Sequence, residues 1–394
     1  MDYFNHIMKR KDKLSRREFL KYSVLALGGL ALSGRGVGDV SAENVRRFHQ
    51  EPIKPEFPVD RQLGRICVGE WGSRVPIRSE PYVDAPAVGS AWYDDVFEWK
   101  QEVIAKQIDR LRINQRWVET PDGYIYADDI QKVRHILQEP LEELPEMEDG
   151  SSGMWVEITT PYIDIDLMKP KENYQWWIRD PNVIYPRVHY SQVFWAFDVR
   201  RHPTTGKVQY CLMQKVGAHP DTYWVDADVC RFISPQEIAP INPDADDKHI
   251  LVQMRGIGLQ TLTCFEGNQE VFFTTVTTGG RDGESGKWIT PLGKHTPWRK
   301  NISMHYSRDG RYFAGFDLPG VGWNFGIEPD GVYIHSTYWH NAFGIMKSNG
   351  CINCRPEDAK WIWRWVEPAI PYETGDLIWS GYGVSTPVTV EVLT

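Results

Sequence analysis

The chain has 394 residues and a formal net charge of −9. This length predicts two or three domains, and a hydrophobic content of 41% is ample for their cores. The acidic balance, without a basic stripe interleaved with aromatic residues, excludes nucleic acid as a partner. The high counts of Trp, Tyr, Gly and Pro favour short strands and tight turns over long helices. We therefore expect a mainly β, multidomain protein.

The N-terminal segment has the pattern of an export signal. Residues 15–21 read S-R-R-E-F-L-K, which matches the twin-arginine pattern and follows a basic start. The apolar stretch 22–32 is too short and too rich in glycine to span a bilayer as a stable helix. We predict a twin-arginine signal peptide over residues 1–42, no stable membrane span after its cleavage, and a protein that works in the periplasm or cell wall.

Two similar modules are predicted after the signal. Residues 43–60 are punctuated by prolines and form a linker. Residues 61–137 contain short β-patterned runs at 65–70, 75–78, 105–113 and 117–119, which indicate a small barrel. The strings V-P-I-R-S-E-P and W-V-E-T-P-D-G-Y-I-Y-A in this region resemble bacterial SH3-like domains.

An internal echo indicates the second module. P-D-G-Y-I-Y-A-D-D-I at 121–130 is repeated in pattern by P-D-T-Y-W-V-D-A-D-V at 220–229. We expect a second SH3-like module with its connector over 154–247, after an acidic, proline-rich linker over 138–153. The aromatic clusters 176–177 and 194–195 would pack in the core or stack on sugar rings, and core packing is favoured.

The export route makes disulfides conceivable, but six cysteines are too few for a disulfide scaffold. Cys211 and Cys230 would pair only if their strands are neighbours, and the sequence leaves this open. The pairing of Cys354 is open as well.

A third region, 248–380, carries longer alternating strands and precedes a C-terminal tail over 381–394. It contains a hairpin over 260–279 that ends in T-T-G, then T-P-L-G-K at 290–294 and G-V-Y-I-H-S at 331–336. The loop S-N-G-C-I-N follows at 348–353, a helix is predicted over 356–366, and a closing strand over 375–379. Taken in order, these segments resemble the catalytic domain of the L,D-transpeptidases (YkuD-type). The expected fold is mainly β, with an L,D-transpeptidase β-sandwich-like domain preceded by two small SH3-like β-barrels.

The residues themselves point to thiol chemistry. A cysteine that follows a histidine at this distance, after a polar doublet and a glycine, has the layout of a nucleophile with its base. The resemblance assigns four catalytic residues: Cys351 as nucleophile, His335 as proton donor and acceptor, Ser336 to orient His335, and the Gly350 backbone to hold the oxyanion. It assigns four substrate-binding residues: Asp330, Gly331, Asn349 and Asn353.

The resemblance implies a peptidoglycan L,D-transpeptidase. Cys351 would form a thioester with one stem peptide, and an amine of a neighbouring stem would then capture the acyl group as a cross-link between third-position residues. No metal or organic cofactor is needed. With water as acceptor the enzyme would be an L,D-carboxypeptidase, and with an inactive thiol the protein would be a non-enzymatic peptidoglycan-binding protein.

Several residues leave alternatives open. Asn349 stands where the family usually has a second histidine, and an amide cannot carry a proton. His340 is a second candidate base, although His335 at the strand end is favoured. Cys351 and Cys354 form a C-x-x-C pair, but the redox motif requires a βαβ setting that this chain lacks. A zinc site would require a further Cys or His pair at matching spacing, and none is apparent.

Overall fold

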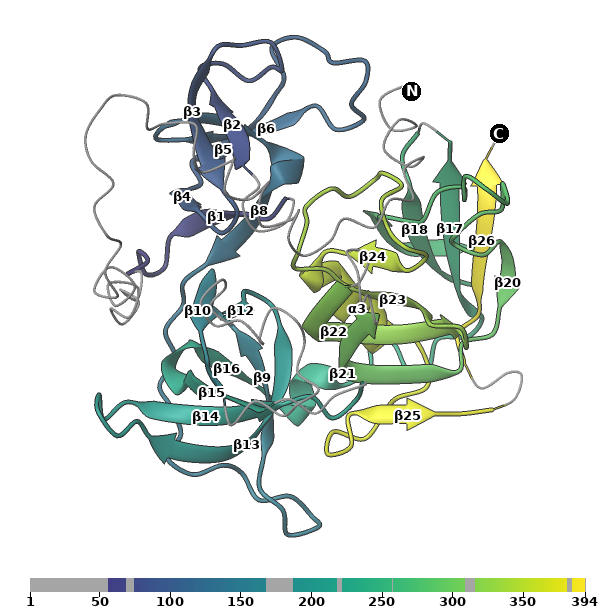
Figure 1. The fold of residues 1–394 in the computed structure, drawn as a ribbon. Coiled ribbons are helices and arrows are strands. Elements are labelled where there is room, and N and C mark those ends of the chain that lie inside the picture. Colours follow the sequence, from purple (N-terminus) through teal and green to yellow (C-terminus); the bar gives the residue numbers. More distant parts are fainter. Residues whose placement is uncertain are drawn as a thin grey trace, which may run out of the picture. The chain divides into compact units, whose positions relative to one another are not determined.

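The computed structural model describes residues 56–68, 74–167, 187–217, 222–256, 258–308, 316–380 and 385–393. The predicted signal peptide, most of the linker 43–60 and the pair 176–177 lie outside these residues. Residues 54–394 form one compact unit. Its described part is built from strands in six sheets and a single α-helix, so the prediction of a mainly β protein is confirmed (Figure 1). Within that part, no helix is long and apolar enough to cross a membrane.

The first module contains two small sheets, ordered β4-β1-β8 and β3-β2-β7-β6-β5. Its elements are β1 (Gln62–Ile66), β2 (Arg74–Arg78), β3 (Ala87–Trp92), β4 (Val96–Glu98), β5 (Gln101–Ile104), β6 (Arg116–Thr120), β7 (Gly123–Tyr126), the 3-10 turn η2 (Ala127–Asp129) and β8 (Ile130–Arg134). The sheets enclose their own core, which includes Val118, Ile125 and Ile130, all fully buried.

The predicted strand over 105–113 is wrong. The chain leaves β5 as a loop, in which the Gln115 amide bonds the backbone carbonyls of Asp109 and Arg112. Ile108 and Leu111 are 77% and 96% exposed, so the alternating apolar residues of this run have no core to face.

The second module contains a six-stranded sheet, ordered β11-β15-β14-β13-β9-β16, and the pair β10-β12. Its elements are β9 (Met154–Ile158), β10 (Tyr162–Asp164), β11 (Asp166–Leu167), β12 (Arg187–His189), β13 (Val193–Arg201), β14 (Val208–Met213), β15 (Thr222–Asp226), η3 (Ala227–Val229), β16 (Cys230–Ile233) and η4 (Pro235–Ile238). The two echo segments fold alike, as strand, 3-10 turn and strand. Cys211 on β14 and Cys230 on β16 are separated by β13 and β9, so their strands are not neighbours.

The second module shares a core with the C-terminal domain. Trp155 and Trp195 are buried in the same apolar cluster as Trp323 of β22. The indole Nε1 of Trp155 donates to the carbonyl of Tyr372 at 2.8 Å, and the Tyr372 hydroxyl donates to the carbonyl of Ile233 at 2.8 Å. The aromatic pair 194–195 therefore serves core packing, the favoured prediction.

The C-terminal domain is a sandwich of two five-stranded sheets. The first is ordered β19-β18-β17-β26-β20 and comprises β17 (Lys248–Arg255), β18 (Thr261–Glu266), β19 (Gln269–Thr275), β20 (Gly293–His295) and β26 (Val388–Leu393). The second is ordered β24-β23-β22-β21-β25 and comprises β21 (Arg299–Arg308), β22 (Phe316–Glu328), β23 (Val332–Ser336), β24 (Ile352–Cys354) and β25 (Asp376–Ile378).

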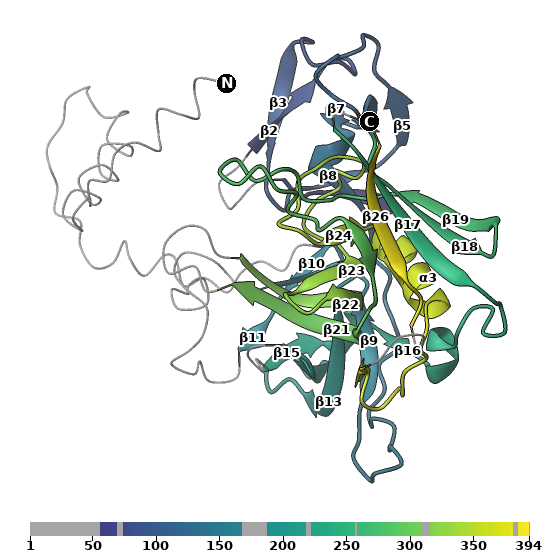
Figure 2. The ribbon, with the colours of Figure 1, turned by 90° about the vertical axis from the view of Figure 1, so that its right-hand side faces the viewer.

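The prediction that residues 381–394 form a C-terminal tail is wrong, because this region contains strand β26. This strand pairs in parallel with β17, with Ile250 opposite Val388 and Val252 opposite Val390 (Figure 2). The alternating sequence of β26 places these two valines in the core. The C-terminal domain therefore extends past residue 380.

Helix α3 (Pro356–Trp365) fits the predicted helix and contacts both sheets. Proline at its first turn removes an N–H that would lack an intrahelical partner. The ring of Trp361 stacks on Phe272 of β19 at 4.3 Å, and Trp363 meets Trp323 of β22 edge to face at 5.3 Å. This packing fixes the inner face of the second sheet and leaves β24 as its edge strand.

Candidate active site

The parallel pair β23–β24 brings the predicted site residues together. Its register places Ile334 opposite Ile352 and His335 opposite Asn353. Because successive side chains point to opposite faces, the two isoleucines enter the core, whereas His335 and Asn353 share the other face. Cys351, two residues before Asn353, continues that face.

The Cys351 thiol lies at the start of β23. Its Sγ donates to the carbonyl of Gly331 at 3.5 Å and accepts the backbone N–H of Tyr333. Loss of water around the sulfur raises the pKa of Cys351 to about 11, although the Tyr333 N–H acts in the opposite direction. At neutral pH the side chain of Cys351 is therefore a thiol.

His335 is held as a neutral imidazole with one defined basic nitrogen. Its Nδ1–H donates to the carbonyl of Ser336 at 2.8 Å, which assigns the proton to Nδ1 and leaves the lone pair on Nε2. The residue is 3% exposed, and this burial lowers the pKa of His335 to about 4, against the opposing effect of the Ser336 hydrogen bond. The rings of Tyr306 and Trp339 lie at 5.1 and 5.7 Å.

The carbonyl of Ser336, and not its hydroxyl, bonds to His335. The Oγ of Ser336 accepts the backbone N–H of Gly322 at 3.0 Å and thereby ties β23 to β22. The next residue of β22, Trp323, has a φ of 62°, a conformation that costs a residue with a Cβ free energy. Asn324 follows and accepts the hydroxyl of Tyr306 at 2.9 Å. The strained residue thus lies next to Gly322, to which the Ser336 hydroxyl is bonded.

Cys351 and His335 are not joined by a hydrogen bond. Among the described residues, no hydrogen bond links Cys351 Sγ to His335 Nε2. Both groups are neutral at pH 7, so the resting site differs from a thiolate–imidazolium pair. Proton transfer between them requires a closer approach than the free protein shows.

The turn before Cys351 depends on glycine. Gly350 has a φ of 126°, and a Cβ at this position would lie 3.2 Å from the carbonyl oxygen of Ile289. Its carbonyl accepts the hydroxyl of Thr290 at 2.8 Å, and its N–H is bonded to the Ser348 hydroxyl at 3.2 Å. The predicted oxyanion donor is therefore engaged by Ser348, which must move away before Gly350 can bind an oxyanion.

His340 is unsuited to be the base. Its Nδ1 accepts the N–H of Ala342 at 3.2 Å, so the one proton of the neutral ring is on Nε2. Nε2 lies 3.0 Å from the amide of Asn353, which must then present its oxygen to that proton. Burial lowers the pKa of His340 to about 3. Its geometry makes His340 a support for Asn353 and favours His335 as the base.

The remaining predicted residues differ in position. The carbonyl of Gly331 contacts the thiol, whereas Asp330 and Asn349 are exposed. Asn353 is anchored in the strand, because its backbone exchanges two hydrogen bonds with Thr277 at 2.9 and 2.8 Å.

Sequence reasoning missed Thr290 as part of the site. Its hydroxyl donates to Gly350 and accepts the backbone N–H of Gly279 at 2.7 Å, so it clamps the cysteine turn onto the T-T-G segment. Thr290 is the first residue of the T-P-L-G-K motif, and Gly279 is the last residue of T-T-G. Both motifs are visible in the sequence, but the sequence does not show that their residues contact each other. Tyr306 was also missed, because nothing in a strand sequence shows that this tyrosine faces a distant histidine.

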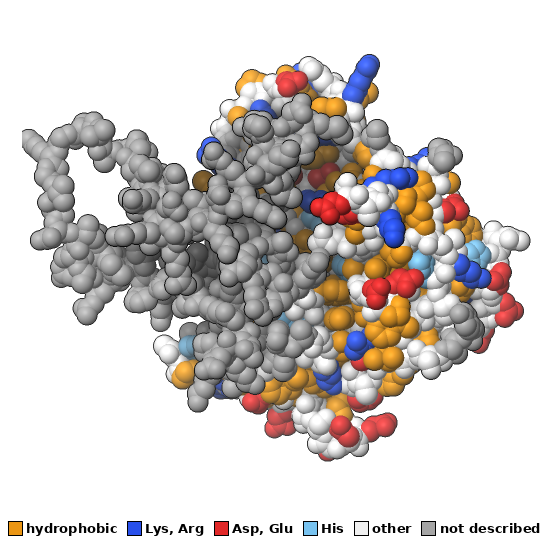
Figure 3. Space-filling model, turned by 45° about the vertical axis from the view of Figure 1, so that its right-hand side comes forward, with side chains coloured by type: hydrophobic (Ala, Val, Ile, Leu, Met, Phe, Trp, Pro, Cys, Tyr) orange, Lys and Arg blue, Asp and Glu red, His pale blue; other side chains and the backbone are white. Residues whose placement is uncertain are grey.

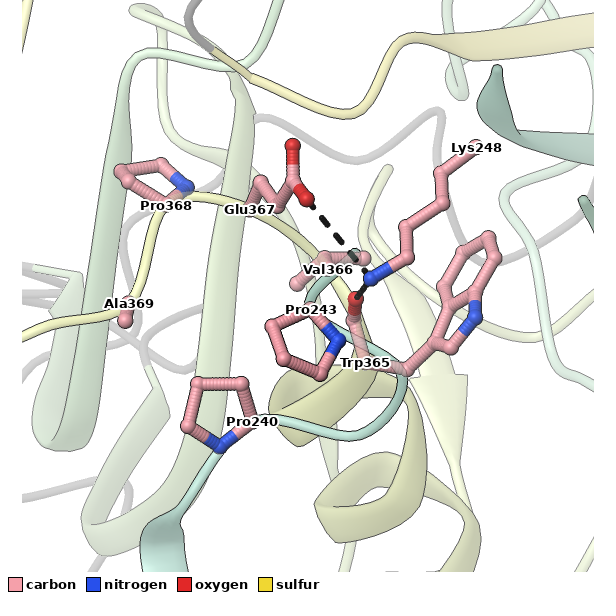
Figure 4. A pocket seen from close by; sticks show the side chains of 8 residues that line it. All are labelled: Pro240, Pro243, Lys248, Trp365, Val366, Glu367, Pro368 and Ala369. Atoms are coloured by element: carbon pink, nitrogen blue, oxygen red, sulfur yellow. Dashed lines mark hydrogen bonds and ion pairs between the residues drawn. The ribbon is translucent and has the colours of Figure 1, made fainter. Parts of the chain in front are cut away.

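A groove elsewhere in the C-terminal domain has no part in this site. Its lining consists of Pro240, Pro243, Lys248, Trp365, Val366, Glu367, Pro368 and Ala369 (Figure 4). The Nζ of Lys248 donates to the carbonyl of Trp365 at 3.2 Å and lies 3.6 Å from the Glu367 carboxylate. Lys248 thus satisfies the end of α3. In the described part of the chain, no cluster of three His, Cys, Asp or Glu side chains is arranged to hold a metal.

Charge on the molecular surface is mixed. The face drawn in Figure 3 carries Lys and Arg side chains among Asp and Glu side chains, with hydrophobic groups between them. No basic stripe is visible on this face.

Comparison with known proteins places the C-terminal domain in a family. Residues 247–390 match the L,D-transpeptidase catalytic domain (YkuD), a span that includes His335, Cys351 and the start of β26. No curated protein matches the chain.

Solved structures of L,D-transpeptidases are among those similar to this chain. The catalytic domain of the E. faecium enzyme is 21% identical, with a TM-score of 0.27, and the match covers 37% of this chain and 98% of that one. The enzyme from Mycobacterium smegmatis is 13% identical, with a TM-score of 0.28, and covers 65% and 98%. The enzyme from Stackebrandtia nassauensis is 21% identical, with a TM-score of 0.20, and covers 40% and 63%.

Proposed function

We propose that this protein is an exported peptidoglycan L,D-transpeptidase that works through a thioester on Cys351. The observation that carries the proposal lies within the matched catalytic domain: β23 and β24 place His335 opposite Asn353, two residues from Cys351, and the Nδ1–H of His335 is bonded to Ser336, which leaves the Nε2 lone pair without a hydrogen bond among the described residues. The twin-arginine pattern supports export to the periplasm or cell wall. The two β modules are proposed to be SH3-like and to help hold the wall polymer.

The proposed reaction begins with acyl transfer to sulfur. As the Cys351 sulfur attacks the carbonyl before a terminal D-Ala, its proton passes to Nε2 of His335. Collapse of the tetrahedral intermediate breaks the C–N bond, and the same proton moves to the departing amine. The product is a thioester on Cys351, free D-Ala and a neutral His335.

The second half reverses the roles. The amine of a neighbouring stem peptide attacks the thioester and gives a proton to His335, which returns it to the sulfur as the thiolate leaves. A neutral imidazole with one lone pair suits these proton transfers, because it can accept and then release a proton in each half of the reaction. Water as acceptor would give the L,D-carboxypeptidase reaction instead.

Mass spectrometry after incubation with a carbapenem tests the nucleophile. We expect one covalent adduct on Cys351 in the natural protein and none in the Cys351→Ser variant, whose fold should be unchanged. Digestion of sacculi treated with the purified protein then identifies the product, and new cross-links between third-position residues are expected. An adduct on another residue, or none with a folded protein, contradicts the proposal.

A non-enzymatic peptidoglycan-binding protein is the second candidate. Three observations favour it: the pKa of Cys351 is raised, no hydrogen bond joins it to His335 among the described residues, and Asn349 replaces the expected histidine. Under this alternative the protein sediments with purified sacculi, yet Cys351 forms no adduct and no new muropeptide appears.

A further inference from the structure

The loop between His335 and Cys351 is held by the first module. Arg65 of β1 donates through Nη2 to the carbonyl of Tyr338 at 2.5 Å. From the loop side, the Asn341 amide donates to the carbonyls of Ala127 at 2.8 Å and Ile130 at 3.1 Å. A small module near the N-terminus thus contacts the catalytic loop at two points, three residues apart.

The guanidinium of Arg65 is buried and has several hydrogen-bond partners. Arg65 is fully buried, and its Nη1 donates to Asp94 at 2.7 Å while Nη2 also donates to Gln131 at 2.8 Å. Asp94 in turn binds Arg187 of the second module at 2.9 Å. A buried guanidinium must be paired, because its desolvation is costly, so each of these partners fixes its position.

From these two anchors the contacts lead to the reacting groups. Trp339 follows the anchored Tyr338, and its ring lies 5.7 Å from that of His335. His340 precedes the anchored Asn341 and binds the amide of Asn353 at 3.0 Å. The loop therefore touches the base on one side and the strand that carries the nucleophile on the other.

We propose that Arg65 and Asn341 are positioning residues for the active site, with the first module serving as a brace for loop 337–343. The brace sets the ring of Trp339 against His335 and the ring of His340 against Asn353, so that Nε2 and the Cys351 sulfur meet when substrate binds. This inference rests on the proposed acyl transfer to Cys351. It makes the first module part of the catalytic machinery, in addition to any role in holding the wall.

The test compares Asn341→Ala with Gln62→Ala in the full chain. Gln62 is a matched control, because its amide also donates to a carbonyl of the first module, that of Val133 at 2.8 Å, but lies outside the loop. Carbapenem acylation of Cys351 is followed by mass spectrometry at several concentrations. We expect Asn341→Ala to lower the maximal acylation rate by about 10- to 100-fold with little change in the half-saturating concentration, since misplaced groups lose rate. Gln62→Ala should retain the natural rate.

A second comparison in the same acylation assay uses the variants Arg65→Lys and Arg65→Met. A lysine can still donate to Tyr338, so Arg65→Lys should recover part of the rate that Arg65→Met loses. Thermal unfolding shows whether each variant is folded at the assay temperature. Natural acylation rates in folded Asn341→Ala and Arg65→Met would overturn the brace.

An independent readout separates this inference from the proposed function. Imidazole nitrogen NMR reports the tautomer of His335, and the brace predicts an altered His335 signal in Asn341→Ala but not in Gln62→Ala. If the natural protein is never acylated, the transpeptidase proposal fails and this spectrum still decides the brace. An unchanged His335 signal in folded Asn341→Ala would overturn it.

Discussion

The two small β modules share a strand–turn–strand segment but are attached to the catalytic domain in opposite ways. The second module contributes Trp155, Trp195 and Ile233 to the core of that domain. The first has its own core and meets the domain through two polar contacts, from Arg65 to the carbonyl of Tyr338 and from Asn341 of the loop to the carbonyl of Ala127. The copy of the segment in the first module contacts the loop after His335 through the carbonyls of Ala127 and Ile130, whereas the copy in the second module is buried in a core of its own module.

This difference shows that sequence similarity between modules does not predict their roles. Apolar contacts are not directional, so the shared core fuses the second module to the sandwich as one packed body. Hydrogen bonds are directional, so the first module fixes the position of one loop carbonyl, that of Tyr338, and of one loop side chain, that of Asn341. Four predictions test the two attachments and the site between them.

The largest effect is expected in the reactivity of Cys351, which lies in the fused body. Because the pKa of this thiol is raised to about 11, the thiolate fraction should rise about tenfold per pH unit. Alkylation by iodoacetamide should thus accelerate about 1,000-fold from pH 6 to pH 9. The rate is measured by mass spectrometry, with Cys351→Ser as the blank. A plateau near neutral pH would instead indicate a thiolate–imidazolium pair with His335.

The shared core is tested by Trp155→Ala and Trp99→Ala. Both indoles are buried, Trp155 in the core shared with the catalytic domain and Trp99 in the core of the first module. Each truncation should cost about 3–5 kcal/mol of unfolding free energy. Denaturant unfolding should show Trp155→Ala shifting the main transition, whereas Trp99→Ala should produce an early transition confined to the first module. If Trp155→Ala also gave a separate early transition, the second module would be an independent domain.

The polar attachment should weaken in acid. Burial opposes ionisation of Asp94, but His189, Arg65 and Arg187 outweigh it and hold the pKa of Asp94 well below its usual range. A carboxyl with a depressed folded pKa stabilises the protein above its unfolded value near about 4, and this stability is lost as pH falls further.

The Asp94→Asn variant isolates that contribution. It should cost about 2–3 kcal/mol at pH 7, since it removes hydrogen bonds between charged groups. The difference from the natural protein should shrink below about pH 4, as followed by thermal unfolding from pH 2 to pH 7. A difference that stays constant over this range would show that Asp94 carries no such charge coupling.

The smallest effect is expected at the exposed pair Arg61 and Glu98 in the first module. Their side chains lie 3.5 Å apart and are 62% and 47% exposed. Water and salt screen such a pair, so Arg61→Ala should change the unfolding free energy by less than about 0.5 kcal/mol. A larger loss in denaturant unfolding would mean that exposed charge pairs contribute substantially to the stability of the first module.

The sequence by itself determined several local elements and the order in which the site motifs follow one another along the chain. Alternating apolar residues predicted β17 and β23, proline and spacing predicted α3, and glycine at 350 predicted the tight turn before the thiol. These features depend on neighbours a few residues away, so a single sequence displays them. His335 and Cys351 are also close in sequence, so the sequence alone suggests them as a candidate base and nucleophile.

Only the tertiary structure decided how these elements meet. Arg65 and Tyr338 are 273 residues apart in sequence, and no local pattern indicates that one binds the carbonyl of the other. The place of β26 beside β17 and the fusion of Trp155 into the catalytic core have the same origin. Burial and partners are properties of the packed chain, because they depend on which distant surfaces exclude water together.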